Sequence, residues 1–201
     1  MIFGGLGPVK VKQLKFRLRT RFRWIEGEIG TLNHRLIDVL NRDDVDSGLV
    51  ADSVLAYDLD PAVERRDHAT INLGNVLFAM PIEEPGAPRP GDPNAHVRKE
   101  PNRVEIGIGS YTVTGNIHLL GGSTPREALR LLRSRFFAVT QVTLRQVDRP
   151  AFHEEHPVVF VNRGAVDYTV PAPLTPREQA VELVEGFLKG EPDDELASLT
   201  K

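Results

Sequence analysis

The chain of 201 residues contains no cysteine, and this absence excludes both a disulfide framework and a thiolate metal site. It contains no apolar run near the length of about 18 residues that a membrane-spanning helix requires. The first residues lack the basic start and the apolar stretch of a signal peptide. We therefore expect a cytoplasmic protein that makes no contact with membranes.

Acidic residues are missing from the first part of the chain. Seven Lys or Arg residues precede the first acid, Glu26, whereas the remainder holds 18 basic and 28 acidic residues. Five of these cations alternate with neighbouring residues and would share one face of an extended strand: Lys15, Arg17, Arg19, Arg21 and Arg23. Such a face with nearby aromatic residues is what binding to a phosphate backbone requires. The favoured interpretation is a solvated strand whose charges prevent edge pairing or meet acids on neighbouring strands.

The same pattern occurs twice in the chain, at an offset of 88 residues. Phe16 and Leu18 correspond to Val104 and Ile106, and Gly27 corresponds to Gly115. The last block matches at an offset of 90, with Ile71–Phe78 corresponding to Val161–Tyr168. Four blocks agree in the same order, which indicates an internal duplication.

Within each copy, apolar and polar residues mostly alternate, which is typical of half-buried strands. Between the second and third strands lies a short helical segment, and in the second copy Thr124-Pro125-Arg126-Glu127 has the pattern of a capping box. Asn72-Leu73-Gly74 and Asn162-Arg163-Gly164 suit a tight turn, because Asn and Gly tolerate positive φ. The pattern of each copy therefore predicts two strands, a short helix and two to three further strands.

The predicted fold class is mainly β with short helices, organised as two tandem small barrel-like or bent-sheet domains. We expect the first domain, with the basic first strand, at 1–82 and the second at 103–172. The proline-rich segment 83–102 is expected to be a linker or a long surface loop. Residues 173–201 predict a C-terminal helix, opened by a second capping signature at Thr175–Glu178, and an acidic tail.

No motif predicts catalysis or a bound metal ion. His153-Glu154-Glu155-His156 has a histidine spacing of three, whereas the zinc-protease helix needs four, and Pro150 and Pro157 flank the segment. We interpret it as a hydrated loop. Asp43–Gly48 lacks the spacing and the final Glu of a calcium loop. We therefore expect no enzyme activity, no cofactor and no metal site.

Two resemblances start from the second copy, and the first of them extends to the first copy through Gly27, Ile29 and Asn72. Tyr111, Gly115, Ile117 and His118 match a Tyr-x-x-x-Gly-x-Ile-His pattern and resemble an uncharacterised prokaryotic small-β-domain family, which implies no known activity. Arg163-Gly164-Ala165-Val166 is similar to the second signature of Sm-like proteins. That similarity implies a small bent-sheet barrel, of a kind that forms rings and binds RNA.

The favoured function is a non-catalytic interaction or assembly module with a protein partner or self-association. The alternative is binding of nucleic acid, RNA in particular, through the basic first strand. The candidate anion-binding residues are Lys15, Arg17, Arg19, Arg21, Arg23 and Arg163.

Overall fold

The computed structural model describes residues 11–32, 34–42, 48–57, 64–82 and 99–173. Among them, no helix has the length and apolar character needed to cross a membrane. The helix and acidic tail expected in 173–201 lie, apart from Pro173, outside the described residues, and so does most of the proline-rich segment 83–102.

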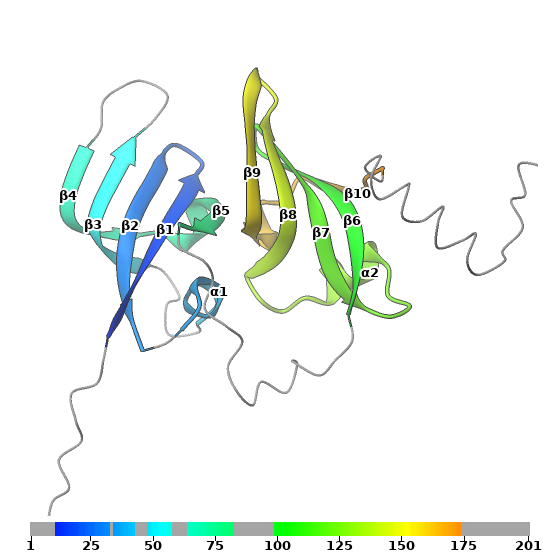
Figure 1. Ribbon diagram of the computed structural model, residues 1–201, viewed down its shortest axis with the longest axis horizontal. Coiled ribbons are helices and arrows are strands. Elements are labelled where there is room, and N and C mark those ends of the chain that lie inside the picture. Colours follow the sequence, from blue (N-terminus) through cyan, green and yellow to red (C-terminus); the bar gives the residue numbers. More distant parts are fainter. Residues whose placement is uncertain (1–10, 33, 43–47, 58–63, 83–98, 174–201) are drawn as a thin grey trace, which may run out of the picture. The chain divides into compact units, whose positions relative to one another are not determined.

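The described residues are mainly β with few short helices, which confirms the prediction of the fold class at this level (Figure 1). The strands are β1 (Lys12–Thr20), β2 (Trp24–Thr31), β3 (Leu49–Tyr57), β4 (Glu64–Ile71), β5 (Val76–Pro81), β6 (Lys99–Ile108), β7 (Tyr111–Leu120), β8 (Phe136–Gln146), β9 (Arg149–Asn162) and β10 (Tyr168–Pro171). The helices are α1 (Leu36–Leu40) and α2 (Pro125–Leu131), and the 3-10 turns are η2 (Leu73–Asn75) and η3 (Arg163–Ala165).

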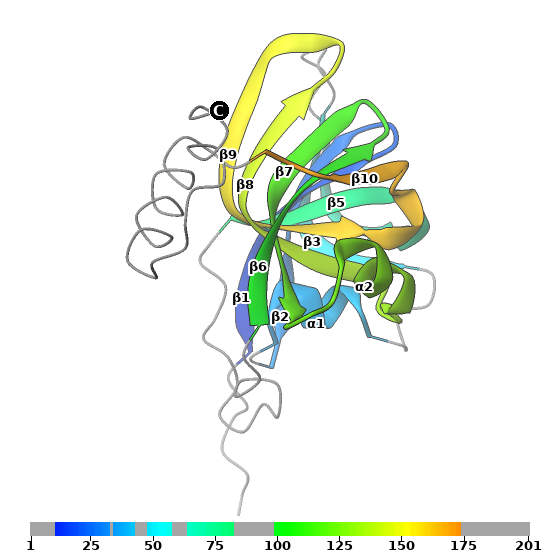
Figure 2. The ribbon, with the colours of Figure 1, turned by 90° about the vertical axis from the view of Figure 1, so that its right-hand side faces the viewer.

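All these strands belong to one open antiparallel sheet, in the order β10-β6-β7-β8-β9-β5-β1-β2-β3-β4. The order contains one arrangement twice. In the first half, formed by β1 to β5, the last strand lies beside the first and the fourth lies at the far edge. The second half, formed by β6 to β10, repeats this order, and Figure 2 shows β10 returning to β6.

The two halves are joined by pairing of β5 with β9, in which Phe78 lies opposite Val161 and Ala79 opposite Phe160. Their hydrophobic cores also share side chains across this junction. Phe78 packs in the core of the second half, whereas Phe160 packs in the core of the first half. Each half therefore covers apolar side chains that the other would otherwise expose to water.

A β-bulge recurs at the same place in both halves and explains the repeated glycines. The strand register shifts beside Gly27 in the first half and beside Gly115 in the second. On the strands opposite them, Ser53 and Gln141 have φ values of 51° and 52°, in the left-handed region. A Cβ atom on Gly115 would lie 2.7 Å from the carbonyl oxygen of Thr140. Glycine is required there because the bulge brings the neighbouring backbone too close for a side chain.

The predicted Asn-x-Gly turns are present, but their physical basis differs from the expectation. Neither Gly74 nor Gly164 has a positive φ. Instead, the side-chain oxygens of Asn72 and Asn162 accept hydrogen bonds from the N–H groups of these glycines, at 2.8 and 3.0 Å. The asparagine side chain thus holds the backbone in a 3-10 turn.

The predicted capping box opens α2. The Thr124 hydroxyl accepts a hydrogen bond from the Glu127 N–H, and the Glu127 carboxylate accepts one from the Thr124 N–H, both at 3.3 Å. These bonds satisfy donors that have no partner within the helix.

The prediction of a hydrated loop at His153–His156 is wrong, because these residues lie in strand β9. This strand runs through Pro150 and Pro157 because it pairs with β8 alone over most of its length, and β5 joins it only at Phe160 and Val161. Proline is tolerated in a strand with an open side, since the missing N–H removes no ladder hydrogen bond there.

The start of β6 corrects the expected linker boundary in the same way. The strand begins at Lys99, inside the segment 83–102. Its Pro101 lies opposite His118 of β7 and outside Val104–Gly107, the part of β6 that pairs with β10. Here too a proline is accommodated where the strand has a neighbour on one side.

Candidate functional site

A hollow of about 650 Å³ lies where the two halves meet. The first half contributes the residues that follow α1 and the turn between β4 and β5. The second half contributes the segment between α2 and β8 and the turn between β9 and β10. The lining residues are Leu40, Asn41, Arg42, Asn72, Gly74, Arg133, Ser134, Arg135, Asn162, Arg163 and Gly164.

Asn162 fixes one wall of this hollow to the other half. Its side-chain amide nitrogen donates to the carbonyl oxygens of Leu73 and Val76, at 3.3 and 2.7 Å. The same side chain closes its own turn by accepting from Gly164. Because Asn162 is buried, these hydrogen bonds satisfy backbone groups that water does not reach.

Asn41 joins the halves at a second point of the hollow. This residue ends α1, and its amide nitrogen donates to the carbonyl oxygen of Phe136 at 2.9 Å. Its side-chain oxygen accepts from the N–H of Phe136 at 2.7 Å. The asparagine amide thus pairs with the first residue of β8 in the way a neighbouring strand would, and it holds the loop before β8 in place.

Four arginines line the hollow, and no Asp or Glu is among its described lining residues. Arg42, Arg133 and Arg163 are exposed, and Arg135 is half-buried. Arg163 donates from Nη1 to the carbonyl oxygen of Leu132, which holds its side chain against the loop before β8. Guanidinium groups gathered around a recess attract anions, above all phosphates, which accept two parallel hydrogen bonds.

The first two arginines of the basic strand do not form an open basic face. Arg17 donates from Nη1 to the Glu154 carboxylate on β9 at 3.0 Å, and its guanidinium carbon lies 4.1 Å from the ring centroid of Trp24. Arg19 is 7% exposed and lies 5.5 Å from the ring centroid of Tyr111. Both cations therefore contact the second half or the shared core, by ion pairing and by cation–π contact.

The expectation of five cations on one strand face is corrected here, because β1 ends at Thr20 and Arg21 and Arg23 lie between β1 and β2. Together with Lys15, these two residues are at the surface. Lys15 is exposed and lies opposite Glu28 in the pairing of β1 with β2. Arg23 is exposed, and its Nη1 lies 3.1 Å from the Glu64 carboxylate. These positions agree with the interpretation in which strand charges meet acids on neighbouring strands.

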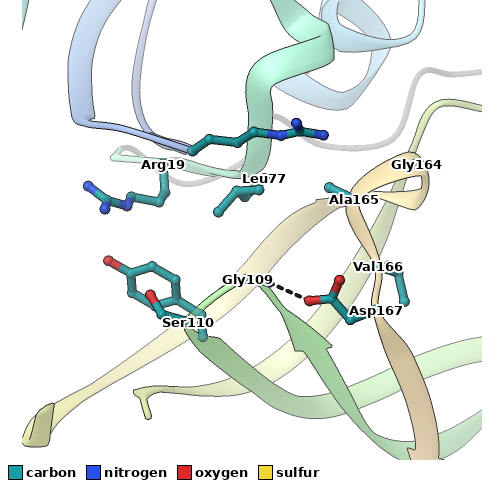
Figure 3. A pocket seen from close by; sticks show the side chains of 10 residues that line it. Arg19, Leu77, Gly109, Ser110, Gly164, Ala165, Val166 and Asp167 are labelled. Atoms are coloured by element: carbon teal, nitrogen blue, oxygen red, sulfur yellow. Dashed lines mark hydrogen bonds between the residues drawn. The ribbon is translucent and has the colours of Figure 1, made fainter. Parts of the chain in front are cut away.

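Arg21 lines a second, smaller hollow of about 270 Å³ together with Arg19. In Figure 3, Arg19 and Leu77 lie on one side of it, and Gly109, Ser110 and Asp167 lie on the other. The Asp167 carboxylate accepts a hydrogen bond from the Gly109 N–H at 2.6 Å. Because a carboxylate is among its lining residues, this hollow is less favourable for an anion than the larger one.

The structure thus separates the cations that the sequence analysis grouped. Arg163 lines the larger hollow, whereas the candidates on and after β1 lie elsewhere. Arg42, Arg133 and Arg135 carry no motif that singles them out in the sequence. Their shared signal is their place directly after a short helix, where the chain turns toward the next strand.

Two other polar clusters have structural explanations. No three His, Asp or Glu side chains in the described part of the chain are grouped so that they could hold a metal ion. His156 lies with Nε2 3.0 Å from the carboxylate of Glu154 that also accepts from Arg17. Burial, reinforced by the hydrogen bond that the Tyr57 hydroxyl donates to Glu26 at 2.7 Å, raises the pKa of Tyr57 to about 12.

Comparison with known proteins adds no family to this description. No protein-family model, curated protein or solved structure matches the chain. The resemblances to a small-β-domain family and to Sm-like proteins therefore stay predictions.

Proposed function

We propose that the protein is a non-catalytic interaction module whose larger hollow binds the phosphate groups of an anionic partner. The observation that carries the proposal is the lining of that hollow, with four arginines, three asparagines and no acid among the described residues. The arginines come from both halves. A ligand with several linked phosphates therefore meets more of them than a single phosphate does, and this favours a nucleic acid. The preference for RNA comes from the similarity of Arg163-Gly164-Ala165-Val166 to the Sm-like signature.

We further infer that the two halves are tandem copies of one small bent-sheet domain. The repeated strand order, the repeated bulge and the repeated 3-10 turn support this view. Arg163 stands in the turn before the last strand of the second copy, within the segment that is similar to the second signature of the RNA-binding Sm-like proteins. The proposed nucleic-acid site thus moves from the basic first strand to the junction.

The test measures binding of a fluorescently labelled single-stranded RNA and of a DNA of the same sequence by anisotropy, across a series of salt concentrations. We expect binding that weakens with salt. The Arg133→Gln/Arg163→Gln variant should bind more weakly, and the slope of log K against log salt should fall by about 0.7 for each phosphate that the variant no longer neutralises.

Arg145→Gln is the matched control. Arg145 is exposed on β8 and lines neither hollow, so its replacement by Gln removes one positive charge without changing the site. A loss per removed charge that is equal in the control and in the hollow variant would show that net charge alone drives binding. Absence of binding to both polymers at low salt would also refute the proposal.

A further inference from the structure

The two ends of the sheet are β4 and β10. Among the described residues, each pairs with a single strand, β4 with β3 and β10 with β6. In the repeat, β4 corresponds to β9 and β10 corresponds to β5, the two strands that join the halves internally. The molecule thus presents at its two ends the two complementary sides of a junction that it already forms once inside.

The backbone near both edges has the geometry of the internal junction. Asn72 precedes its 3-10 turn with φ −68° and ψ 110°, and Asn162 does so with φ −74° and ψ 112°. Both side chains close the turn with the same hydrogen bond. The chain therefore enters the last strand through the same kind of turn in both halves.

Exposure of apolar side chains distinguishes β10 from its equivalent β5, and among the described residues β10 has a neighbour on one side alone. Phe78 and Met80 of β5 are 0% and 2% exposed, since the second half covers them. Their equivalents on β10 are Tyr168 and Val170, which are 46% and 44% exposed. A strand that presents such side chains at a sheet edge is a template for pairing with another chain.

We propose that a second copy of this chain pairs its β4 with β10, repeating the internal contact of β9 with β5. The register follows from the internal one by the offset of 90 residues. Phe78 opposite Val161 becomes Tyr168 opposite Ile71, and Ala79 opposite Phe160 becomes Thr169 opposite Thr70. The contact joins two different edges, so each molecule can bind one neighbour at its β4 edge and another at its β10 edge. The product is a closed ring or an open chain.

Asn72 supplies a specific hydrogen bond in this contact. At the internal junction, the amide nitrogen of Asn162 donates to the carbonyl oxygens of Leu73 and Val76. The same geometry directs the amide nitrogen of Asn72 to the carbonyl oxygens of Arg163 and Val166 of the second copy. The intermolecular junction therefore keeps the polar anchor of the internal one.

The contact between copies is weaker than the internal one. Val158 and Phe160 pack in the internal junction, and their equivalents on β4 are the exposed His68 and Thr70. Less apolar surface is buried, so we expect association that is reversible and depends on concentration.

Disulfide trapping tests the register, because the chain has no cysteine of its own. Thr70→Cys and Thr169→Cys are prepared as two separate full-length proteins and mixed under mild oxidation. Directly opposed strand residues lie within reach of a disulfide, so the mixture should give a covalent dimer containing one chain of each variant. Either variant alone should stay uncrosslinked, since the contact places no residue opposite itself.

Val50→Cys mixed with Thr169→Cys is the control. Val50 is exposed and lies opposite Thr70 on β3, one strand further from the edge, where a disulfide is out of reach. Equal crosslinking in the control, or crosslinked dimers of Thr70→Cys alone, would overturn the proposed register. No crosslink in any mixture, together with a monomer by light scattering at every concentration, would overturn the association itself.

Asn72→Asp provides a second readout that does not depend on cysteine. Aspartate keeps an oxygen for the Gly74 N–H but loses the amide donor, so the fold stays intact while association weakens by about tenfold. Unchanged association in a variant with an unchanged melting curve contradicts the proposed role of Asn72. Asn72 also lines the larger hollow, so the two proposals are separated by the cysteine variants at Thr70 and Thr169, which line neither hollow, and by the nucleic-acid test at Arg133 and Arg163.

Discussion

Asn162 offers a direct measurement of how strongly the two halves hold each other. Its side chain is 4% exposed and donates to Val76 and Leu73 across the junction, at 2.7 and 3.3 Å. It also closes its own 3-10 turn. Its repeat equivalent Asn72 is exposed and closes the matching turn by accepting from the Gly74 N–H. The pair therefore separates the contribution of the turn from the contribution of the junction.

Replacing Asn162 by Ala removes three hydrogen bonds, and Asn72→Ala removes the one to Gly74. With a net contribution of about 1 kcal/mol for each bond, the two variants lose about 3 and about 1 kcal/mol of unfolding free energy. The difference of about 2 kcal/mol is the share of the two bonds that cross the junction. It exceeds the uncertainty of a well-determined unfolding curve.

Urea unfolding of both variants and of the unaltered protein, followed by circular dichroism, gives these free energies. One cooperative transition is expected for the unaltered protein, because side chains of each half pack in the core of the other. Equal losses in the two variants would refute the inference that Asn162 stabilises the junction. Two separate transitions in the unaltered protein would show that the halves unfold independently.

Two further predictions concern the bulge and the half-buried hydrogen bond between Tyr57 and Glu26. Gly115→Ala should lower the free energy of unfolding by about 1–3 kcal/mol, and by more than Gly27→Ala does. A Cβ atom at position 115 would lie 2.7 Å from the Thr140 carbonyl oxygen, whereas one at position 27 would lie 3.0 Å from a side-chain ring carbon, which can move more easily. Equal shifts of the melting temperature in the two variants would contradict this. Tyr57→Phe should lower the free energy of unfolding by about 1 kcal/mol below pH 10, because it removes the hydrogen bond to Glu26. Since the folded-state pKa of Tyr57 is raised to about 12, that contribution is fully present below pH 10 and is lost as the pH rises through 12. Absorbance titration of both proteins measures that pKa, and a difference curve centred near 10 would contradict it.

Local features of the fold were predictable because they depend on neighbouring residues. The alternation around Phe16 and Leu18 gives β1, and the capping box at Thr124–Glu127 opens α2. The turns at Asn72 and Asn162 were found as well, although a side-chain hydrogen bond shapes them and not a positive φ.

Strand β9 was mispredicted at His153–His156 because prolines there were interpreted without knowledge of the strand's neighbours. Whether a proline breaks a ladder depends on how many strands lie beside it, and pairing partners lie far away in the sequence. The candidate site shows the same limit. Arg163 was chosen from its local motif, whereas Arg42 and Arg133 join it only because the folded chain brings three loops to one hollow.

The sequence by itself predicted the alternation of the strands and the positions of Gly27 and Gly115, at which the structure has its two bulges. These properties follow from side-chain period and backbone sterics, which act within a few residues. The tertiary structure decided that β5 pairs with β9, that Arg17 and Arg19 contact the other half or the shared core, and that the arginines after the helices surround a hollow. Those outcomes depend on which apolar edges cover one another, a choice made over the whole chain and not by any segment of it.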